Sequence, residues 1–407
     1  MDFTVKAEQL NQKLSTLSAD NKLKNTRIIC GNYNDIANHL SRSFPQAKVL
    51  VLSTEKTFEE RGKEIIEQLE RAGIKPVNVI LSEEEPLSVE GICGLMNAPE
   101  DVRVVIVLDY SLFDTALYFC AIKKVHLVEV LHKFVPKRIM ANSLLIKNGN
   151  DVDLFVADVE RTVVIYEGAI SSDVMPNTLA YVLSKILSLT DYRVMGVVMR
   201  QPLFPEAFNL ARQAVLGTLK EVGKSEFSLC DLIYNAFLLE IADNLTKGKL
   251  ISFSAPSLAE YIYNGKFAGD SGVELLCANV GLDCYSALFS GQYDKTNMPI
   301  NYYSRSKKLS LTSGILEDSI LSTYKMQGNR FAMRKAKINQ LFLDLKAELI
   351  SENKLYNAVV DKYILLGGKK DYDVDKLSHA IMLSGDTPFS VNGMSLVREN
   401  NVSNYSI

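Results

Sequence analysis

The hydrophobic pattern of this chain changes its period near Ile170, and that change limits the folds that the chain can adopt. Before Ile170, short apolar runs alternate with stretches of helical period. The runs that we expect to be strands cover residues 26–30, 47–53, 76–81, 102–108 and 125–130. After Ile170 the period stays helical, with helices expected over residues 179–189, 207–222, 229–245, 314–326, 329–349 and 374–383. The sequence therefore predicts an α/β domain over residues 1–170 and an all-helical domain over residues 171–407.

The order of elements in the first domain predicts a doubly wound, Rossmann-like sheet. Strands that alternate with helices need right-handed crossovers, which produce a mainly parallel sheet covered by helices. The expected helices cover residues 34–43, 64–73, 87–96 and 112–122. Ligands bind such sheets beyond the carboxyl ends of the strands, so a ligand is expected at the turns after Ser53 and Leu108. Residues 143–166 are expected to form a hairpin or paired edge strands, because Gly149 and Asn150 split their apolar runs.

Composition favours a folded protein that binds neither nucleic acid nor membrane. The 407 residues are 47% hydrophobic, which is too apolar for a disordered chain. The formal net charge of −3 provides no basic face for a phosphate backbone, and two short basic runs, residues 305–308 and 330–337, fit solvated surface. Charges interrupt the most apolar region, residues 102–130, and the first residues lack a signal-peptide pattern. Six scattered cysteines without a CxxC pair predict reduced thiols and a cytoplasmic protein.

Histidine, the most common acid/base and metal-binding side chain, is scarce. The four histidines are His39, His126, His132 and His379. His126 and His132 flank Glu129, but their segment fits a strand as well as a helix, so we favour a core or surface role for all three. Cys120 lies on an apolar helix face without a basic neighbour, which predicts a structural thiol. The glycines at residues 367–368 are expected to end a helix, because no strand precedes them as in a phosphate loop.

Four stretches of the chain resemble the superfamily of 3-dehydroquinate synthase, iron-containing alcohol dehydrogenase and glycerol-1-phosphate dehydrogenase. They are residues 26–40, 48–74, 109–124 and 161–194. The first two are similar to the family's first two strands and the helices that follow them. The third stands where the family has three glycines that head a helix, and the fourth resembles the strand that leads into the helical domain. The resemblance implies a dehydroquinate synthase-like fold, and the glycerol-1-phosphate dehydrogenase branch is the most similar.

At the cofactor turn that the resemblance implies, the chain departs from the family pattern. The three glycines of the family fall on Leu108, Asp109 and Tyr110. Glycine lets a backbone approach a dinucleotide pyrophosphate, whereas a carboxylate and an aromatic ring repel and block it. Ser111 and Asp114 match the family, so they are the candidate cofactor-binding residues, although such residues are also common helix caps. The family's ribose-binding Asp falls on Thr54, and its Pro-Thr pair on Glu129 and Val130.

The resemblance also implies a divalent metal held by a carboxylate and two histidines. These positions fall on Tyr181 or Val182, on Tyr261, and near Ser306 and Lys307. None of the four histidines stands at any of them. Since zinc or iron in such a site needs imidazole and carboxylate together, we expect no metal ligand, no family-type catalytic residue and no cofactor.

Three functions follow as hypotheses. The first is a degenerate, non-catalytic homologue that acts as a binding or assembly partner, with a small molecule in the cleft between the domains, a second copy or another protein as its ligand. The second is an active NAD(P)-dependent oxidoreductase on a phosphorylated polyol or alcohol, with a divalent metal on unusual ligands. The third is a metal-free cyclase or lyase that uses Lys185, Asp114 and Glu260, and it ranks last because no Lewis acid would stabilise the developing charge. The rings that are candidates to fill the cleft are those of Tyr110, Tyr181 and Tyr261.

Overall fold

The structure, a computed structural model, describes residues 3–17, 22–81, 95, 98–137, 139–148, 151–222, 224, 228–265, 268–289 and 301–399. The chain divides into two compact units. Unit 1 comprises Met1–Gly149, Asp153–Val174 and Leu229–Phe237, and unit 2 comprises Asn150–Val152, Met175–Ser228 and Leu238–Ile407. Within the described residues, no helix is both long and apolar enough to cross a membrane.

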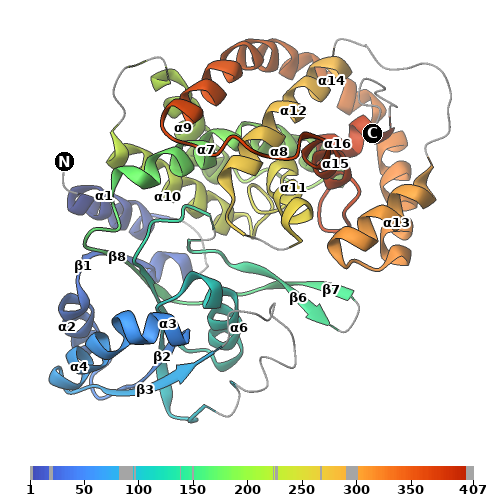
Figure 1. Cartoon of the computed structure of the whole chain (residues 1–407). Coiled ribbons are helices and arrows are strands. Elements are labelled where there is room, and N and C mark those ends of the chain that lie inside the picture. Colours follow the sequence, from blue (N-terminus) through green and yellow to red (C-terminus); the bar gives the residue numbers. More distant parts are fainter. Residues whose placement is uncertain are drawn as a thin grey trace. The chain divides into compact units, whose positions relative to one another are not determined.

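Unit 1 is built on a six-stranded sheet in the order β1–β8–β5–β4–β2–β3, in which every neighbouring pair is parallel (Figure 1). The strands are β1 (Arg27–Gly31), β2 (Lys48–Ser53), β3 (Lys75–Ile80), β4 (Val102–Val107), β5 (His126–Leu131) and β8 (Arg161–Tyr166). Five of them lie where the apolar runs predict strands. The doubly wound α/β fold predicted from the alternating pattern is therefore confirmed.

Helices pack on both faces of this sheet. On one face lie α2 (Tyr33–Ser43) and α4 (Lys63–Arg71), and their apolar side chains share a core with Val51 and Ile106. On the other face lies α6 (Phe113–Lys123), which shares a separate core with Leu52, Val105 and Val107. The chain therefore turns toward opposite faces from β2 and β4, which are neighbours in the sheet.

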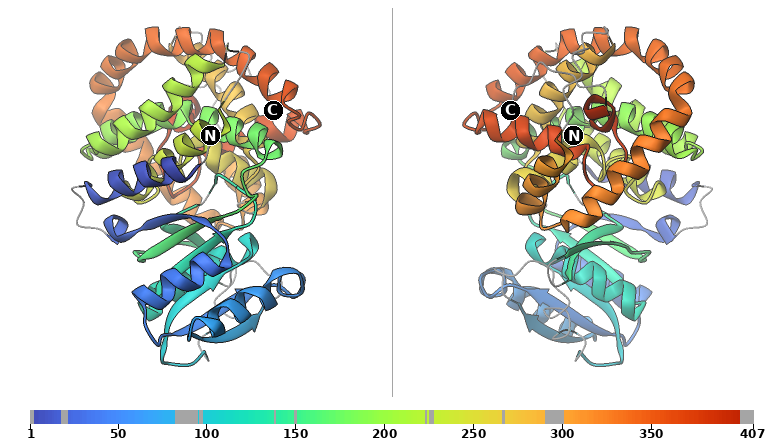
Figure 2. Two further views of the ribbon diagram at one scale, coloured as in Figure 1. Left: turned by 90° about the vertical axis from the view of Figure 1, so that its left-hand side faces the viewer. Right: turned by 90° about the vertical axis from the view of Figure 1, so that its right-hand side faces the viewer.

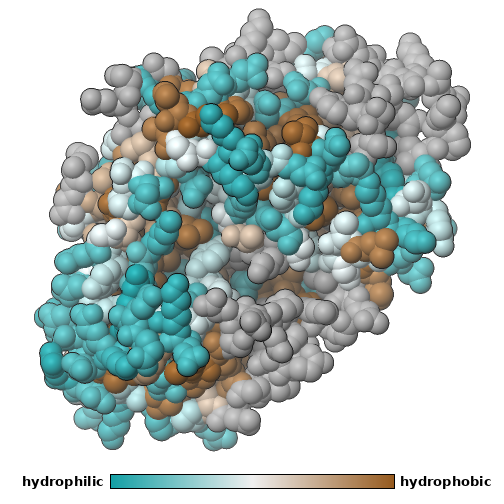
Figure 3. All heavy atoms as spheres, viewed as in Figure 1, coloured by the Kyte–Doolittle hydropathy of each residue, from teal (hydrophilic) through white to brown (hydrophobic). Residues whose placement is uncertain are grey.

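The outward side of α4 is charged, as the helical period predicts. Its Ile65 and Leu69 are buried, whereas Glu64, Glu67 and Arg71 are exposed. Figure 3 shows hydrophilic side chains over this part of unit 1. The helix expected over residues 87–96 lies outside the described residues, apart from Leu95.

The prediction for residues 143–166 is partly wrong. The strands β6 (Ser143–Asn148) and β7 (Asp151–Val156) do form a two-stranded sheet, but β8 lies inside the parallel sheet between β1 and β5. All residues of β8 except Tyr166 are buried, which is why its middle residues, Val163 to Ile165, are continuously apolar rather than alternating.

Unit 1 also contains α1 (Phe3–Ser15), which protects the outer edge of β1. β1 pairs with β8 on one side only. On the other side, the Asn11 side chain donates from Nδ2 to the Ile28 carbonyl and accepts from the Ile28 N–H, both at 2.8 Å. The amide therefore satisfies the two backbone groups that an exposed edge strand would offer to another chain.

Unit 2 is helical. Its helices are α7 (Met175–Ser184), α8 (Ile186–Met199), α9 (Pro205–Glu221), α11 (Ala255–Asn264), α12 (Ser271–Phe289), α13 (Tyr302–Ser313), α14 (Glu317–Leu365), α15 (Val374–Ser384) and α16 (Gly393–Glu399), and α10 (Leu229–Leu245) belongs partly to each unit. Figure 2 shows α14 as a long arc over the other helices of this unit. α14 ends before Gly367, whose positive φ of 92° confirms the predicted helix-terminating turn.

One prediction for the helical region is wrong. The helices expected over 314–326 and 329–349 are one helix, α14, because the single Gly328 costs about 1 kcal/mol relative to alanine and does not break a packed helix. The polar segment after Gly385 contains a buried helix, α16. Arg398 in this helix forms an ion pair with buried Asp386 at 3.1 Å, which explains how a polar segment packs inside.

A buried carboxylate connects four helices of unit 2. Asp191 on α8 accepts hydrogen bonds from the backbone N–H of Ala255 at 2.7 Å and of Gly393 at 2.9 Å, at the beginning of α11 and α16. It also accepts from the Tyr285 hydroxyl on α12. Burial raises the pKa of Asp191 to about 6, although these hydrogen bonds favour the ionised form.

We predict that Asn11→Ala destabilises the protein by about 1–3 kcal/mol, because two backbone groups of Ile28 lose their partners. The free energy of unfolding would be measured by urea denaturation. Gln12→Ala, at the exposed neighbouring position, serves as the control and should change stability by less than about 0.5 kcal/mol. Equal effects of the two variants would contradict the role given to Asn11.

Asp191 should also make stability depend on pH. Its raised pKa means that the folded state binds the proton more tightly than the unfolded state, so its contribution is fully present below about pH 4 and is lost as the pH rises through about 6. A shift of this size corresponds to about 3 kcal/mol. In Asp191→Asn this titration is absent. The unfolding free energy of the natural protein relative to the variant should therefore fall between pH 4 and pH 7, and parallel pH profiles would refute the assignment.

Candidate functional site

The carboxyl ends of β2 and β4 form the place in unit 1 where a ligand is expected. These two strands are paired, and the Leu108 N–H donates to the Leu52 carbonyl at 3.1 Å just where they end. Because the chain leaves them toward opposite faces, a doubly wound sheet has its binding crevice here. The turns after Ser53 and Leu108, predicted from the sequence as the ligand position, meet at this point.

Asp109 occupies this position, and its carboxylate is surrounded by donors. Its Oδ2 accepts from the hydroxyl groups of Thr57 at 2.7 Å and Thr54 at 3.0 Å, which follow β2. Its Oδ1 accepts from the backbone N–H of Ser111 at 3.0 Å and from the Ser111 hydroxyl at 2.8 Å. Thr54 caps the N-terminus of α3 (Glu55–Thr57), and Asp109 caps the short 3-10 turn Tyr110–Leu112 that leads into α6. Asp109 therefore connects the two turns of the crevice.

The Asp109 side chain is ionised at neutral pH. Partial burial opposes ionisation, but the hydrogen bonds from Thr57, Ser111 and Thr54 outweigh it and lower the pKa of Asp109. A fixed negative charge thus stands at the position that the sequence resemblance assigns to a dinucleotide pyrophosphate.

The residues of this turn do not fit a dinucleotide. A pyrophosphate binds where backbone N–H groups and hydroxyls are free and no anion is near. Here the Ser111 N–H and the hydroxyls of Thr54 and Thr57 already bond to Asp109. Two unit charges about 4 Å apart would repel by roughly 4 kcal/mol near a protein surface. Tyr110 is fixed as well, since its hydroxyl donates to the Lys137 carbonyl at 3.1 Å.

Ser111 and Asp114, the predicted cofactor-binding residues, have clear positions in the structure. Ser111 uses both its N–H and its hydroxyl on Asp109, and Asp114 lies in the first turn of α6. Their role in cofactor binding stays a prediction. A free Ser111 hydroxyl would be required for it, and the hydrogen bonds to Asp109 occupy that hydroxyl.

A histidine, His132, lies close enough to Asp109 for the two side chains to interact electrostatically. His132 donates from Nδ1 to the Leu108 carbonyl at 3.2 Å and accepts at Nε2 from the Tyr33 hydroxyl at 2.5 Å. The carbonyl can only accept, so it determines which ring nitrogen carries the proton. Burial lowers the pKa of His132 to about 4, so the ring is neutral. The ring of Tyr166 packs against both Tyr33 and His132, with centroids 4.8 and 5.2 Å away.

His126, Glu129 and His132 do not form one site. His126 begins β5, and its Nε2 lies 3.0 Å from the Thr162 hydroxyl. Glu129, on the same strand, forms a buried ion pair with Arg161 at 2.9 Å and accepts from the Met140 N–H at 3.1 Å. The segment is a strand rather than a helix, so the three side chains make separate contacts within unit 1.

In unit 2, tyrosines occupy the positions that the resemblance assigns to metal ligands. Tyr181 is fully buried and donates its hydroxyl to Glu240. Burial and the neighbouring Glu240 raise the pKa of Tyr181 well above its usual value. Tyr261 donates to the Ser313 carbonyl at 2.9 Å, and burial raises its pKa to about 12. Neutral phenols with engaged hydroxyls are poor ligands for zinc or iron.

The third position assigned to a metal ligand also fails to fit. Ser306 is buried and donates to the Tyr303 carbonyl at 2.9 Å, while Lys307 is exposed. In the part of the chain that the structure describes, no three His, Cys, Asp or Glu side chains converge as a metal site. The residues at these positions therefore do not fit the divalent ion that the fold implies.

The buried charges near Tyr181 are paired with each other. Lys185 donates to Glu274 at 2.6 Å and to the Ser257 hydroxyl at 3.1 Å, and its ammonium lies 4.6 Å from the centre of the Tyr181 ring. Glu260 accepts from the Asn264 amide at 3.0 Å and from the backbone N–H of Ala268 at 2.9 Å. Lys185 and Glu260 thus have separate partners. Glu240 and Glu274 could not be singled out from the sequence, because each lies in a long apolar helix without a motif.

Comparison with known proteins agrees with the fold. Neither the known family models nor the curated proteins give a match to this sequence. Among solved structures, an iron-containing alcohol dehydrogenase from Corynebacterium glutamicum aligns with a TM-score of 0.53 and 10% identity, over 93% of this chain and 96% of that one. An archaeal halo-thermophilic alcohol dehydrogenase from a Red Sea brine pool has a TM-score of 0.49 and 11% identity, over 91% and 95% of the two chains. Glycerol dehydrogenase from Schizosaccharomyces pombe has a TM-score of 0.43 and 11% identity, over 86% and 93%.

The alignment with the Corynebacterium enzyme spans nearly the whole of both chains, so it includes the α/β part and the helical part alike. The resemblance predicted from the sequence is confirmed at the level of the fold, and nothing singles out the glycerol-1-phosphate branch. This chain has the fold of the iron-containing alcohol dehydrogenases.

Proposed function

We propose that this protein is a non-catalytic homologue of metal- and NAD(P)-dependent dehydrogenases, which acts by binding a partner or ligand. The observation that carries the proposal is the ionised Asp109 carboxylate, which holds Thr54, Thr57 and Ser111 at the switch point of the sheet. These donors bond to a carboxylate of the protein itself, so they are not free to bind a pyrophosphate.

The positions assigned to metal ligands support the same proposal from the other unit. Tyr181 and Tyr261 are buried phenols whose hydroxyls bond to Glu240 and Ser313. Hydride transfer to or from an alcohol in this fold relies on a divalent ion that polarises the substrate oxygen, and these residues supply no suitable ligand set. Loss of both sites in one chain is more easily explained by loss of the reaction than by replacement of each site separately.

The competing function is an active NAD(P)-dependent oxidoreductase on a phosphorylated polyol or another alcohol, with a metal on other ligands. The fold shared with the Corynebacterium glutamicum enzyme favours it. This alternative requires a dinucleotide to bind despite Asp109, and it requires metal ligands other than the residues at the family positions. Both requirements can be tested on the purified protein.

The proposal places the protein in a reducing compartment such as the cytoplasm, because all five cysteines within the described residues are free thiols. Its partner in this role is a small molecule, another protein or a second copy of the chain. Nucleic acid is not proposed, because the chain has 48 acidic and 45 basic residues.

The experiment is a combined test for metal and turnover. The purified protein would be incubated with zinc or ferrous iron, desalted, and examined for bound metal by elemental analysis. It would then be assayed for NADH and NADPH oxidation with aldehydes and with phosphorylated ketones. We expect less than one metal ion per ten chains and no turnover above the rate without protein.

One bound metal ion per chain together with NAD(P)H-dependent turnover would overturn the proposal in favour of the oxidoreductase. The variant Tyr181→Phe further distinguishes the non-catalytic protein from the metal-dependent oxidoreductase. It removes the hydroxyl that bonds to Glu240. If a metal were bound near Tyr181, this variant would lower metal occupancy, whereas the proposal predicts that metal content stays at background in both proteins.

A further inference from the structure

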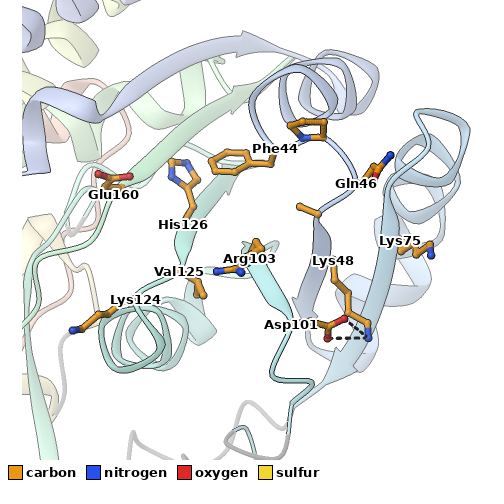
Figure 4. Close-up of a pocket in the computed structure, with 12 residues that line it drawn as sticks. Phe44, Gln46, Lys48, Lys75, Asp101, Arg103, Lys124, Val125, His126 and Glu160 are labelled. Atoms are coloured by element: carbon orange, nitrogen blue, oxygen red, sulfur yellow. Dashed lines mark hydrogen bonds and ion pairs between the residues drawn. The ribbon is translucent and has the colours of Figure 1, made fainter.

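A pocket of about 700 Å³ opens at the amino ends of the strands of unit 1, whereas Asp109 lies at their carboxyl ends. It lies beside the beginning of β2, β3, β4 and β5 (Figure 4). Its volume falls within the range of small-molecule sites, which runs from about 300 to 1,000 Å³. No motif in the sequence pointed to this edge, and no residue of the predicted cofactor or metal positions lines it.

Positive charge predominates in the lining. The charged side chains are Lys48, Lys75, Arg103, Lys124, Asp101 and Glu160. Asp101 forms an ion pair with Lys48 at 3.1 Å, and Glu160 accepts from the Asn25 amide at 2.9 Å. Within the residues that the structure describes, no carboxylate forms an ion pair with Lys75, Arg103 or Lys124.

The sheet register brings these like charges close together. Lys48 and Lys75 are directly paired at the beginning of β2 and β3, so their ammonium groups leave neighbouring positions on the same face. Like charges at directly opposed positions are destabilising unless an anion lies between them. Of these two lysines, Asp101 offsets only Lys48. The hydrogen bond from Lys48 contributes most to lowering the pKa of Asp101, and the positive charge of nearby Arg103 lowers it further. Asp101 thus interacts with two of the cations, Lys48 and Arg103.

The cations surround the pocket rather than gathering on one side. Figure 4 places Arg103 near the middle, with Lys75 and Lys124 on opposite sides. All three are exposed, so their side chains can turn toward a ligand without disturbing the core. Arg103 has the planar, forked arrangement of donors that matches a phosphate or carboxylate, whereas lysines act as point charges.

Two rings form an apolar wall of the same pocket. Phe44 and His126 both line it, and their ring centroids lie 4.8 Å apart. Burial lowers the pKa of His126 to about 4, so the imidazole is neutral and adds no charge. The pocket therefore combines a cationic centre with an aromatic wall, which suits a ligand that has an anionic end and a ring.

We propose that this pocket binds a small phosphate ester with two or more negative charges, of nucleoside diphosphate size, whose phosphates contact Arg103, Lys75 and Lys124 and whose ring lies against Phe44 and His126. This site is independent of the function proposed above. It lies at the amino ends of the strands rather than at their carboxyl ends, and it uses none of the residues on which that proposal rests. A protein without a working dinucleotide crevice would still have a small-molecule site here.

The test is isothermal titration calorimetry at low ionic strength with ADP, inorganic pyrophosphate and citrate as separate probes. We expect saturable one-to-one binding of ADP, weaker binding of pyrophosphate and no saturable binding of citrate. Arg103→Ala and Lys124→Ala should each weaken ADP binding by about tenfold, as expected for a lost charge-assisted hydrogen bond. Raising the salt concentration should weaken it as well.

Lys123→Ala is the matched control, because Lys123 precedes Lys124 on α6 and does not line the pocket. It should bind ADP as the natural protein does. The proposal is overturned if ADP shows no saturable binding at millimolar concentration, if citrate binds as tightly as ADP, or if Lys123→Ala and Lys124→Ala lose affinity equally. Circular dichroism would check that each variant is folded.

Discussion

The Asp109 carboxylate accepts four hydrogen bonds at the switch point of the sheet. These bonds join the turn after β2 to the turn after β4, the two turns between which a doubly wound sheet binds its ligand. Because Asp109 is ionised and its donors come from its own unit, the crevice is satisfied internally. The chain thus combines the fold of the iron-containing alcohol dehydrogenases with a carboxylate at the position that the sequence resemblance assigns to a phosphate.

The helical unit shows the same internal pairing. Lys185 is buried with Glu274, and Tyr181 with Glu240, so polar groups at and beside a position that the sequence resemblance assigns to a metal ligand have protein partners. Burying a charge is costly unless it is paired, and here each named group has a partner within hydrogen-bonding distance. Substituting only one partner would leave an uncompensated buried charge, so a single substitution in such a pair would destabilise the protein.

Much of the fold could be predicted from the sequence, because period and burial are linked. The runs that became β2 and β4 are buried on both faces, and such strands are continuously apolar. The position of β8 could not be predicted, since pairing partners are set by the three-dimensional order of strands, which a local pattern does not contain. α14 was divided wrongly because Gly328 locally disfavours a helix that packing along its length maintains.

The site could be predicted only in part. The turns after Ser53 and Leu108 do lie together at the ends of neighbouring strands, and their role in ligand binding stays a prediction. The partners of Asp109 could not be predicted, because Thr57 and Asp109 are 52 residues apart and meet only when β2 and β4 are neighbours. Glu240 and Glu274 gave no signal, since a single acid in an apolar helix looks like a solvated position until its buried partner is known. The basic pocket also depends on the sheet, because its cations come from the beginnings of different strands.

If Asp109 prevents a dinucleotide from binding at the switch point, the affinity for NADH must differ between the natural protein and Asp109→Gly. Titration followed by NADH fluorescence should give no saturable binding to the natural protein at up to millimolar concentration. Asp109→Gly, which removes the charge and frees the donors of Thr57 and Ser111, should gain measurable affinity. Saturable micromolar binding of NADH by the natural protein, unchanged or weakened by Asp109→Gly, would show that Asp109 does not exclude the dinucleotide.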